Sequence, residues 1–258
     1  MLDLPISTVE ITIFGIALIV WAGLLFGGFV IGTPNEDDTR RMPVQTRLLS
    51  SFVLVIASWM WFAISQGTPV SLLAAWFAIG MTLGFIGDVF MAQILSVEPH
   101  VLYGMSAFGI GHIAYIIGMW LIALPHERPY PNITLLLMCW GIVAIVWLGF
   151  ILRPRTTRTQ QNTDAPSLFL VFAALPYSLL LATTVGFAIS LALLDPTFVL
   201  ISIGAVLFLV SDLLIALRLF NGLRFRLVDD VVWFLYGPGQ MLIIFGLIIA
   251  TVVDALVG

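Results

Sequence analysis

The sequence contains no lysine and few charged residues of any kind. Only 9% of its 258 residues are charged, 61% are hydrophobic, and the mean hydropathy is +1.13. Soluble domains carry about 25% charged residues, so this chain cannot cover a water-facing surface in the ordinary way. The composition therefore indicates an integral membrane protein whose main partner is the lipid bilayer.

Cysteine is nearly absent as well. Cys139 is the single cysteine and lies in an apolar run, which excludes an intrachain disulfide and leaves no Cys/His pair for zinc. The sequence also lacks a glycine-rich phosphate loop, a nucleophile elbow, an HExxH motif and a basic patch for nucleic acid. We therefore expect no cofactor, no metal and no nucleic-acid partner.

Long apolar runs are what the sequence has in abundance. A membrane-spanning helix needs about 20 apolar residues, and runs of this length alternate with short breaks that contain proline, glycine and acidic residues. They predict an all-α integral membrane protein, with one transmembrane domain over 1–258. The eight helices are expected near 11–31, 46–65, 72–95, 101–124, 132–152, 167–190, 197–219 and 230–253.

The ten arginines are distributed unevenly among the predicted loops. Arg128 lies in an even-numbered loop. The other nine lie in or beside odd-numbered loops: Arg40, Arg41, Arg47, Arg153, Arg155, Arg158, Arg218, Arg224 and Arg226. Because cytoplasmic loops carry the excess of basic residues, loops one, three, five and seven are expected in the cytoplasm. Both termini of this multi-pass cell-membrane protein are then expected on the non-cytoplasmic side.

Two carboxylates lie inside predicted helices, Asp88 in the third and Asp212 in the seventh. A charged residue at the centre of a membrane helix costs about 2.5–3.5 kcal/mol, so each is expected to face a partner or a wet cavity. With a rise of about 1.5 Å per residue, both lie roughly 10 Å inside the cytoplasmic surface. Two carboxylates at one depth predict a functional pair, whereas Asp229 and Asp230 open the last helix and are explained as caps.

Five other polar side chains are predicted between the midplane and the cytoplasmic surface: His112, Tyr115, Tyr177, Tyr236 and Gln240. Sequence gives their depth but not their direction, so a shared cavity in the cytoplasmic half is an inference. Each also has a structural interpretation, as an interhelical hydrogen-bonding or packing residue.

Glycine and proline residues favour a cavity at this depth. Gly80, Gly84 and Gly87 strip side chains from the third helix and allow a neighbour or a ligand to approach Asp88. Pro176 and Pro238 predict interrupted helices beside Tyr177 and Gln240, and broken helices at membrane depth usually line a cavity.

Paired carboxylates in an apolar setting suit acid–base chemistry. Each opposes the ionisation of the other, so one can remain protonated while the other is ionised. Such a pair supplies a general acid and a general base, the arrangement that glycosidases use on acetals. A vinyl ether in a lipid is an acid-sensitive bond of the same kind.

Four segments resemble motifs of the YhhN/lysoplasmalogenase family: Gly87-Asp88, Phe108…His112…Tyr115, Gly204…Ser211-Asp212 and Tyr236…Gln240. They occur in the family's order on the third, fourth, seventh and eighth predicted helices. The resemblance implies an eight-helix enzyme that hydrolyses the vinyl ether of lysoplasmalogens. Its products would be a fatty aldehyde and glycerophosphoethanolamine or glycerophosphocholine.

The resemblance implies that Asp88 and Asp212 are catalytic and that His112, Tyr115 and Gln240 line the site. Where the family often has Lys-Pro at the start of the second helix, this chain has Arg47-Leu48, which keeps a basic group and loses the proline. Arg47, together with Arg218, is a candidate for contact with the lipid phosphate, although interface anchoring explains both equally well.

Two other classes of function fit the same residues. His112, Asp88 and Asp212 as zinc ligands would make the protein a metal-dependent lipid amidase or esterase. Carboxylates that bind protons or cations would instead make it a transporter of ions or small solutes.

Overall fold

The computed structural model describes residues 6–95, 97–124, 129–151 and 168–257, and within them it contains helices and no strands. The helices are α1 (Thr8–Ile31), α2 (Val44–Ile64), α3 (Ser71–Met91), α4 (His100–Ala123), α5 (Ile133–Val146), the π-helix η1 (Trp147–Ile151), α6 (Leu168–Leu194), the short 3₁₀ helix η2 (Pro196–Phe198), α7 (Val199–Asn221) and α8 (Val228–Val257). Eight segments of this described part are long and apolar enough to cross a membrane, as the sequence predicted. The length and composition of these helices are those of a multi-pass membrane protein.

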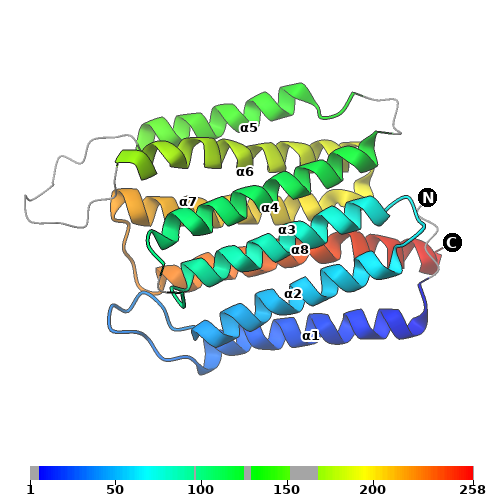
Figure 1. Cartoon of the computed structure of the whole chain (residues 1–258), viewed down its shortest axis with the longest axis horizontal. Coiled ribbons are helices and arrows are strands. Elements are labelled where there is room, and N and C mark those ends of the chain that lie inside the picture. Colours follow the sequence, from blue (N-terminus) through cyan, green and yellow to red (C-terminus); the bar gives the residue numbers. More distant parts are fainter. Residues whose placement is uncertain (1–5, 96, 125–128, 152–167, 258) are drawn as a thin grey trace, which may run out of the picture.

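Successive long helices run in opposite directions, so the odd-numbered connections gather at one end of the bundle (Figure 1). The start of α1 and the end of α8 lie together at the opposite end. This arrangement agrees with both termini on one side of the membrane. Their placement on the non-cytoplasmic side is a prediction from the arginine distribution. Arg128, Arg153, Arg155 and Arg158, which contributed to it, lie outside the described residues.

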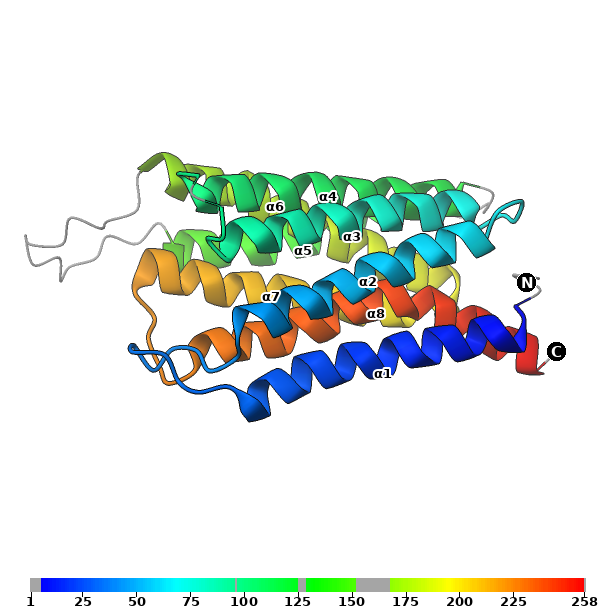
Figure 2. The ribbon, with the colours of Figure 1, turned by 60° about the horizontal axis from the view of Figure 1, so that its bottom comes forward.

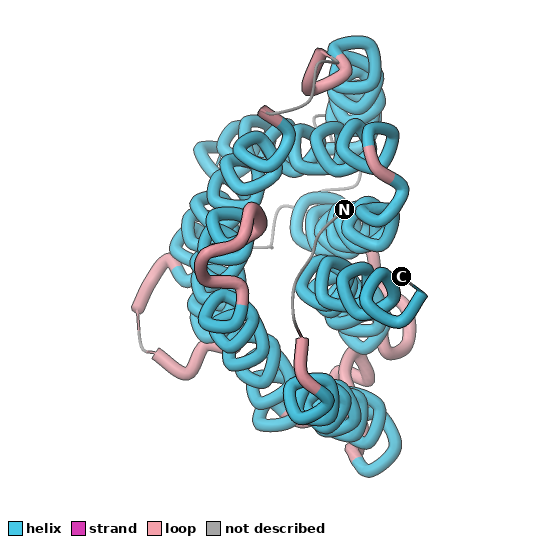
Figure 3. Tube along the Cα trace, turned by 90° about the vertical axis from the view of Figure 1, so that its right-hand side faces the viewer, coloured by secondary structure: helices cyan, strands magenta, loops and turns pink. Residues whose placement is uncertain are grey.

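The helices pack side by side with their axes roughly aligned (Figures 2 and 3). The most extensive contacts are those of α3 with α4 and of α7 with α8. Helix α2 touches α1, α3 and α8, while α6 touches α4, α5 and α7. The body of α5 packs against α6, and its π-helical end, η1, packs against α7. This peripheral position of α5 is important for the cavity described below.

Local sequence signals explain where several helices begin and end. Ser7 and Glu10 form a reciprocal capping box at the start of α1, which satisfies two backbone N–H groups. Helix α7 ends at Gly222, whose φ of 68° is the left-handed conformation that glycine adopts without a steric penalty. Most observed boundaries differ from the predicted ones by only a few residues.

Two expectations about the helices were wrong. Helix α3 ends at Met91 and not at 95, because Gln93 adopts a left-handed backbone with φ of 56°. Pro176 and Pro238 do not interrupt α6 and α8, each of which is continuous through its proline. A proline removes one hydrogen bond of the helical ladder, and neighbouring helices in a bundle can hold the remainder in place.

Candidate functional site

Asp88 is buried in α3, with 4% of its surface exposed. Its Oδ2 atom accepts a 2.5 Å hydrogen bond from the Ser51 hydroxyl of α2. The Tyr236 hydroxyl of α8 interacts with the same carboxylate. Two hydroxyl groups from two other helices thus take the place of water around it, as an intramembrane carboxylate requires.

The glycine face of α3 brings large side chains close to Asp88, as the sequence suggested. A Cβ atom on each glycine would come within 3 Å of a neighbouring side chain, namely Tyr115 for Gly80, Gln240 for Gly84 and Phe108 for Gly87. Since real Cβ atoms essentially never come so close, a side chain at Gly80 or Gly87 would require an aromatic ring to move, whereas one at Gly84 would displace the end of the Gln240 side chain. Protein side chains fill the space that the glycines leave.

Hydrogen bonds connect three of the predicted site residues. The Tyr115 hydroxyl donates to Gln240 Oε1 at 3.2 Å, and Gln240 Nε2 donates to the Tyr236 hydroxyl oxygen at 3.3 Å. Because Tyr236 also meets Asp88, side chains from α3, α4 and α8 form one polar network. Tyr115, Tyr236 and Gln240 therefore belong to the surroundings of Asp88.

Asp212, on α7, has its own partners. Its Oδ2 atom accepts a 2.5 Å hydrogen bond from the Tyr177 hydroxyl of α6, and the Ser211 hydroxyl lies 3.5 Å from its Oδ1. Tyr177 and Asp212, which the sequence placed in the same half of the membrane, are thus in direct contact.

A cavity of about 240 Å³ lies next to Asp212. Its walls come from α4, α5, η1, α6 and α7, together with Met91 at the end of α3, and they are almost entirely apolar. Among the described residues that line it, Asp212 is the one with a carboxylate, and Tyr177 lies beside it. A carboxyl–phenol pair in an apolar wall is a suitable place for a reaction on an amphipathic molecule.

Asp88 lies outside this cavity, behind a layer of aromatic rings. Phe108 lines the cavity on one side and packs against Gly87 on the other. Its ring centroid lies 5.9 Å from that of Phe208 and 6.0 Å from that of Tyr236. A short chain of side chains links the two carboxylates: Tyr236, whose hydroxyl meets Asp88, has its ring centroid 5.2 Å from that of Phe208, which lies one helical turn before Asp212 on α7. The structure thus brings the two carboxylates near each other but gives them different hydrogen-bond partners.

His112 is buried and turns toward α6 instead of toward either aspartate. Its Nδ1 lies 3.0 Å from the Thr184 hydroxyl, which itself donates to the Leu180 carbonyl. Because that hydroxyl proton is used, Thr184 accepts from His112, which places the imidazole proton on Nδ1. Its Nε2 has no hydrogen-bond partner among the described residues.

The described residues do not include three His, Cys, Asp or Glu side chains grouped closely enough to hold a metal ion. The zinc alternative required such a group from His112, Asp88 and Asp212. The position of His112 therefore gives that alternative no support.

Arg47, near the start of α2, is 7% exposed. Its guanidinium carbon lies 5.4 Å from the ring centroid of Trp233, and its charge acts on Asp88. Within the described part of the chain, its Nε and Nη2 atoms have no hydrogen-bond partner. Buried donors of this kind are costly when unpaired, so they are available for an anionic group.

Arg218, the other candidate for a phosphate contact, forms an ion pair with Asp229 at the end of α7. It is half-exposed and does not line the cavity. The structure thus separates the two arginines, one beside Asp88 and the other in an ion pair near the surface.

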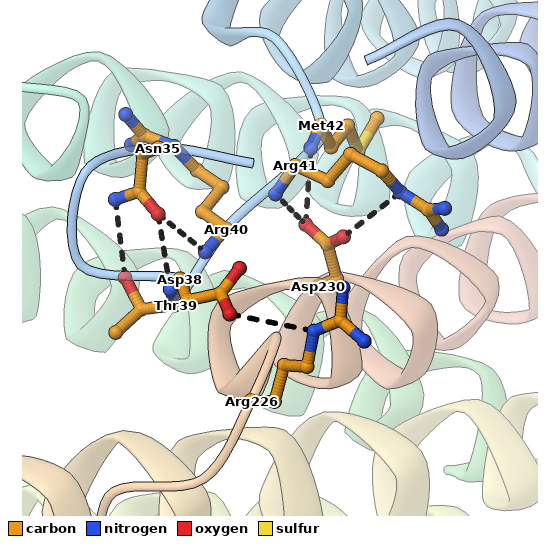
Figure 4. Close-up of polar contacts among 8 residues, drawn as sticks. All are labelled: Asn35, Asp38, Thr39, Arg40, Arg41, Met42, Arg226 and Asp230. Carbon is orange, nitrogen blue, oxygen red and sulfur yellow. Dashed lines mark hydrogen bonds and ion pairs between the residues drawn. The ribbon is translucent and has the colours of Figure 1, made fainter. Parts of the chain in front are cut away.

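The sequence suggested that Asp230 is a simple helix cap, but in the structure it bonds to the first loop. Its Oδ1 accepts hydrogen bonds from the backbone N–H groups of Arg41 and Met42, at 3.0 and 3.1 Å, and its Oδ2 lies 3.7 Å from Arg41 Nε (Figure 4). Nearby, Arg226 pairs with Asp38 at 3.4 Å (Figure 4). These contacts attach the first loop to the start of α8, at the end of the bundle where Arg47 lies.

Sequence reasoning missed Ser51, although a signal was present. Arg47, Ser51 and Ser58 are spaced four and then seven residues apart, which places them on one face of a helix. A polar stripe on an otherwise apolar helix indicates a buried polar partner. Thr184 contacts the His112 imidazole and Trp147 lines the cavity. No comparable sequence pattern pointed to either residue.

The sequence was compared with protein families, curated proteins and solved structures. No curated protein and no solved structure shows significant similarity to the chain. The family model described as the YhhN family matches residues 11–247, which include all eight long helices in whole or in part. The chain therefore belongs to the YhhN family.

Proposed function

We propose that this protein is a hydrolase that cleaves the vinyl ether bond of lysoplasmalogens, with Asp88 and Asp212 as its acid–base pair. The products would be a fatty aldehyde and glycerophosphoethanolamine or glycerophosphocholine. The observation that carries the proposal is the Asp212–Tyr177 pair in the wall of an apolar cavity, with a second buried carboxylate close by. Membership of the YhhN family supports the same activity.

The chemistry requires a proton donor, a proton acceptor and one water molecule. Protonation of the outer vinyl carbon produces an oxocarbenium ion, and water then adds to the carbon that bears the oxygen. A carboxylate accepts a proton from this water, and the resulting hemiacetal separates into an aldehyde and an alcohol. Asp212 lines the cavity, so it is the carboxyl group that contacts the reacting bond in this proposal. Asp88 is the second member of the pair, and for it to reach the same bond or the attacking water the proposal requires the Phe108 ring, which separates it from the cavity, to move aside when substrate binds.

The remaining site residues support this arrangement. Arg47 does not line the cavity either, but its unpaired donors lie on the Asp88 side of the aromatic layer and suit an anionic group such as a lipid phosphate there. Tyr115, Tyr236 and Gln240 hold the surroundings of Asp88, while His112 keeps an acceptor nitrogen, Nε2, in the apolar core. Arg218 is engaged by Asp229 and has no part in the proposed site.

Removal of either carboxyl tests the proposal. We expect Asp212→Asn and Asp88→Asn each to lower aldehyde release from a lysoplasmalogen by about 10²–10⁴-fold, the usual contribution of a general acid or base. Mass spectrometry of the products formed by purified protein in detergent or nanodiscs would measure this loss.

Asp37→Asn is the matched control, because Asp37 is exposed in the first loop and away from the cavity. It should leave the rate unchanged. Wild-type activity in both site variants would remove the acid–base assignment, and absence of aldehyde from the unmodified protein would remove the proposed activity.

A further inference from the structure

The cavity beside Asp212 reaches the outer surface of the bundle between α5 and α7. Two of its lining residues are themselves exposed, Ile142 of α5 at 60% and Val210 of α7 at 40%. The body of α5 packs against α6, whereas contact with α7 is made by η1 at one end of α5. A lateral mouth therefore lies between α5 and α7, at the level of Ile142 and Val210.

This mouth faces hydrocarbon and not water. Ile142 and Val210 belong to helices of membrane-spanning length and high hydropathy. Exposed apolar side chains on such helices contact lipid tails, so an opening between them admits an alkyl chain and excludes charged solutes. The mouth is consequently fitted to one class of occupant, the chain of a lipid.

The cavity also offers polar groups to an amphipathic ligand. Trp147 of η1 lines it and is 7% exposed, and its Nε1 has no hydrogen-bond partner among the described residues. An unpaired buried N–H is unfavourable, and an oxygen atom of a bound lipid would satisfy it. Ile142 lies five residues before Trp147, about 7.5 Å away along the helix axis. On α7, Val210 likewise lies on the membrane-midplane side of Asp212.

We propose that the mouth between α5 and α7 is a lateral portal through which the hydrocarbon chain of a single-chain ether lysolipid enters the cavity from the bilayer. The inference deepens the proposed function and rests on it for the identity of the lipid. The bound chain extends past Ile142 and Val210 toward the bilayer midplane. Its oxygen-bearing end lies between Asp212 and Trp147.

Photoaffinity labelling tests the portal without requiring catalysis. The probe is a saturated 1-alkyl lysophosphatidylethanolamine with a diazirine in its chain, which lacks the vinyl ether and cannot be cleaved. With wild-type protein in nanodiscs, we expect label on the α5 and α7 peptides that excess unlabelled 1-alkyl lysolipid suppresses at least fivefold. Label on α1, which faces lipid elsewhere, should not respond to the competitor.

Two variants of one helix provide a matched pair. Ile142→Trp should obstruct the mouth and remove most of the competable label, while Ile145→Trp, at a position that is 71% exposed and away from the cavity, should not. Trp147→Phe, which deletes the N–H and keeps an aromatic ring, should weaken competition by about 3- to 10-fold. Competable label that is absent, or that is unchanged by Ile142→Trp, would overturn the portal.

Aldehyde release from an alkenyl lysolipid, measured in parallel, separates this inference from the proposed function. Competable label at the portal without aldehyde would leave the portal standing and remove the hydrolase. Aldehyde release without competable label, and with full activity in Ile142→Trp, would support the hydrolase and remove the portal.

Discussion

Ser51 and Ser58 lie on the same face of α2 and are both buried, yet their hydroxyls have different partners. Ser51 donates to Asp88 on another helix, whereas Ser58 donates at 2.8 Å to the Val55 carbonyl of its own helix. At the scale of the residue, the consequence of losing a hydroxyl therefore depends on what remains behind. The Val55 carbonyl is part of a helix, while a buried carboxylate without its donor is costly.

We expect Ser51→Ala to lower the free energy of unfolding by about 1–3 kcal/mol, because the buried Asp88 carboxylate loses a hydrogen-bond donor. The same change should slow aldehyde release, since Asp88 would no longer be held in place. Ser58→Ala should change the unfolding free energy by less than about 0.5 kcal/mol. Denaturant titration in detergent micelles, together with the product assay, would compare the two variants. Equal effects from both would show that Ser51 has no special relation to Asp88.

At the scale of the element, the glycines of α3 allow side chains of neighbouring helices to pack directly against its backbone. A Cβ atom on Gly84 would lie 2.8 Å from Gln240 Nε2, which is hydrogen-bonded to Tyr236. Helix propensity alone favours alanine over glycine by about 0.5–1 kcal/mol in a helix interior. Glycine at this position is thus explained by packing and not by helix formation.

We expect Gly84→Ala to displace the Gln240 amide, to disturb the contacts of Tyr236 and to reduce activity several-fold. Gly23→Ala, at a position of α1 where an added Cβ meets nothing within 4 Å, should stabilise the protein slightly or leave it unchanged. Thermal unfolding and aldehyde release in the same detergent would measure both effects. A Gly84→Ala protein with wild-type activity would mean that the pose of Gln240 is unimportant.

At the scale of the whole molecule, Asp230 joins two parts of the chain that are far apart in sequence. It accepts from the backbone N–H groups of Arg41 and Met42, while Asp229 N–H donates to the Thr39 carbonyl at 2.9 Å. The first loop is therefore attached to α8 by hydrogen bonds that are buried or partly buried. The exposed Arg226–Asp38 pair adds little, because surface ion pairs contribute about 0–1 kcal/mol.

We expect Asp230→Ala to release this loop and to lower the free energy of unfolding by about 1–3 kcal/mol, because the buried N–H of Met42 and the partly buried N–H of Arg41 lose their acceptor. Hydrogen exchange at the amides of Arg41 and Met42 should accelerate. The matched control in the same loop, Asp37→Ala, should leave both exchange and stability unchanged. Unaltered protection of the two amides in Asp230→Ala would show that other contacts hold the loop.

Much of the fold could be predicted from the sequence because each span is encoded locally. About 20 consecutive apolar residues determine a membrane helix whatever its neighbours are. The depth of Asp88, Asp212, Tyr177 and Gln240 followed from counting residues along a helix of known rise. The site could be predicted only as a layer within the membrane.

The direction of each side chain around its helix axis was decided by packing. Tyr177 turned toward Asp212, His112 toward Thr184, and Asp88 toward Ser51. None of these pairs is close in sequence, so no local pattern could have connected them. Helices α6 and α8 are likewise continuous through their prolines, against expectation.

By itself, the sequence determined that the chain forms membrane-length helices, and it predicted that two carboxylates lie at one depth within them, because hydropathy and helical rise are properties of a single segment. The tertiary structure alone decided that Asp212 lines an apolar cavity while Asp88 lies behind a layer of aromatic rings. The physical reason is that a cavity forms where several helices meet, and the rotation of each helix depends on its neighbours.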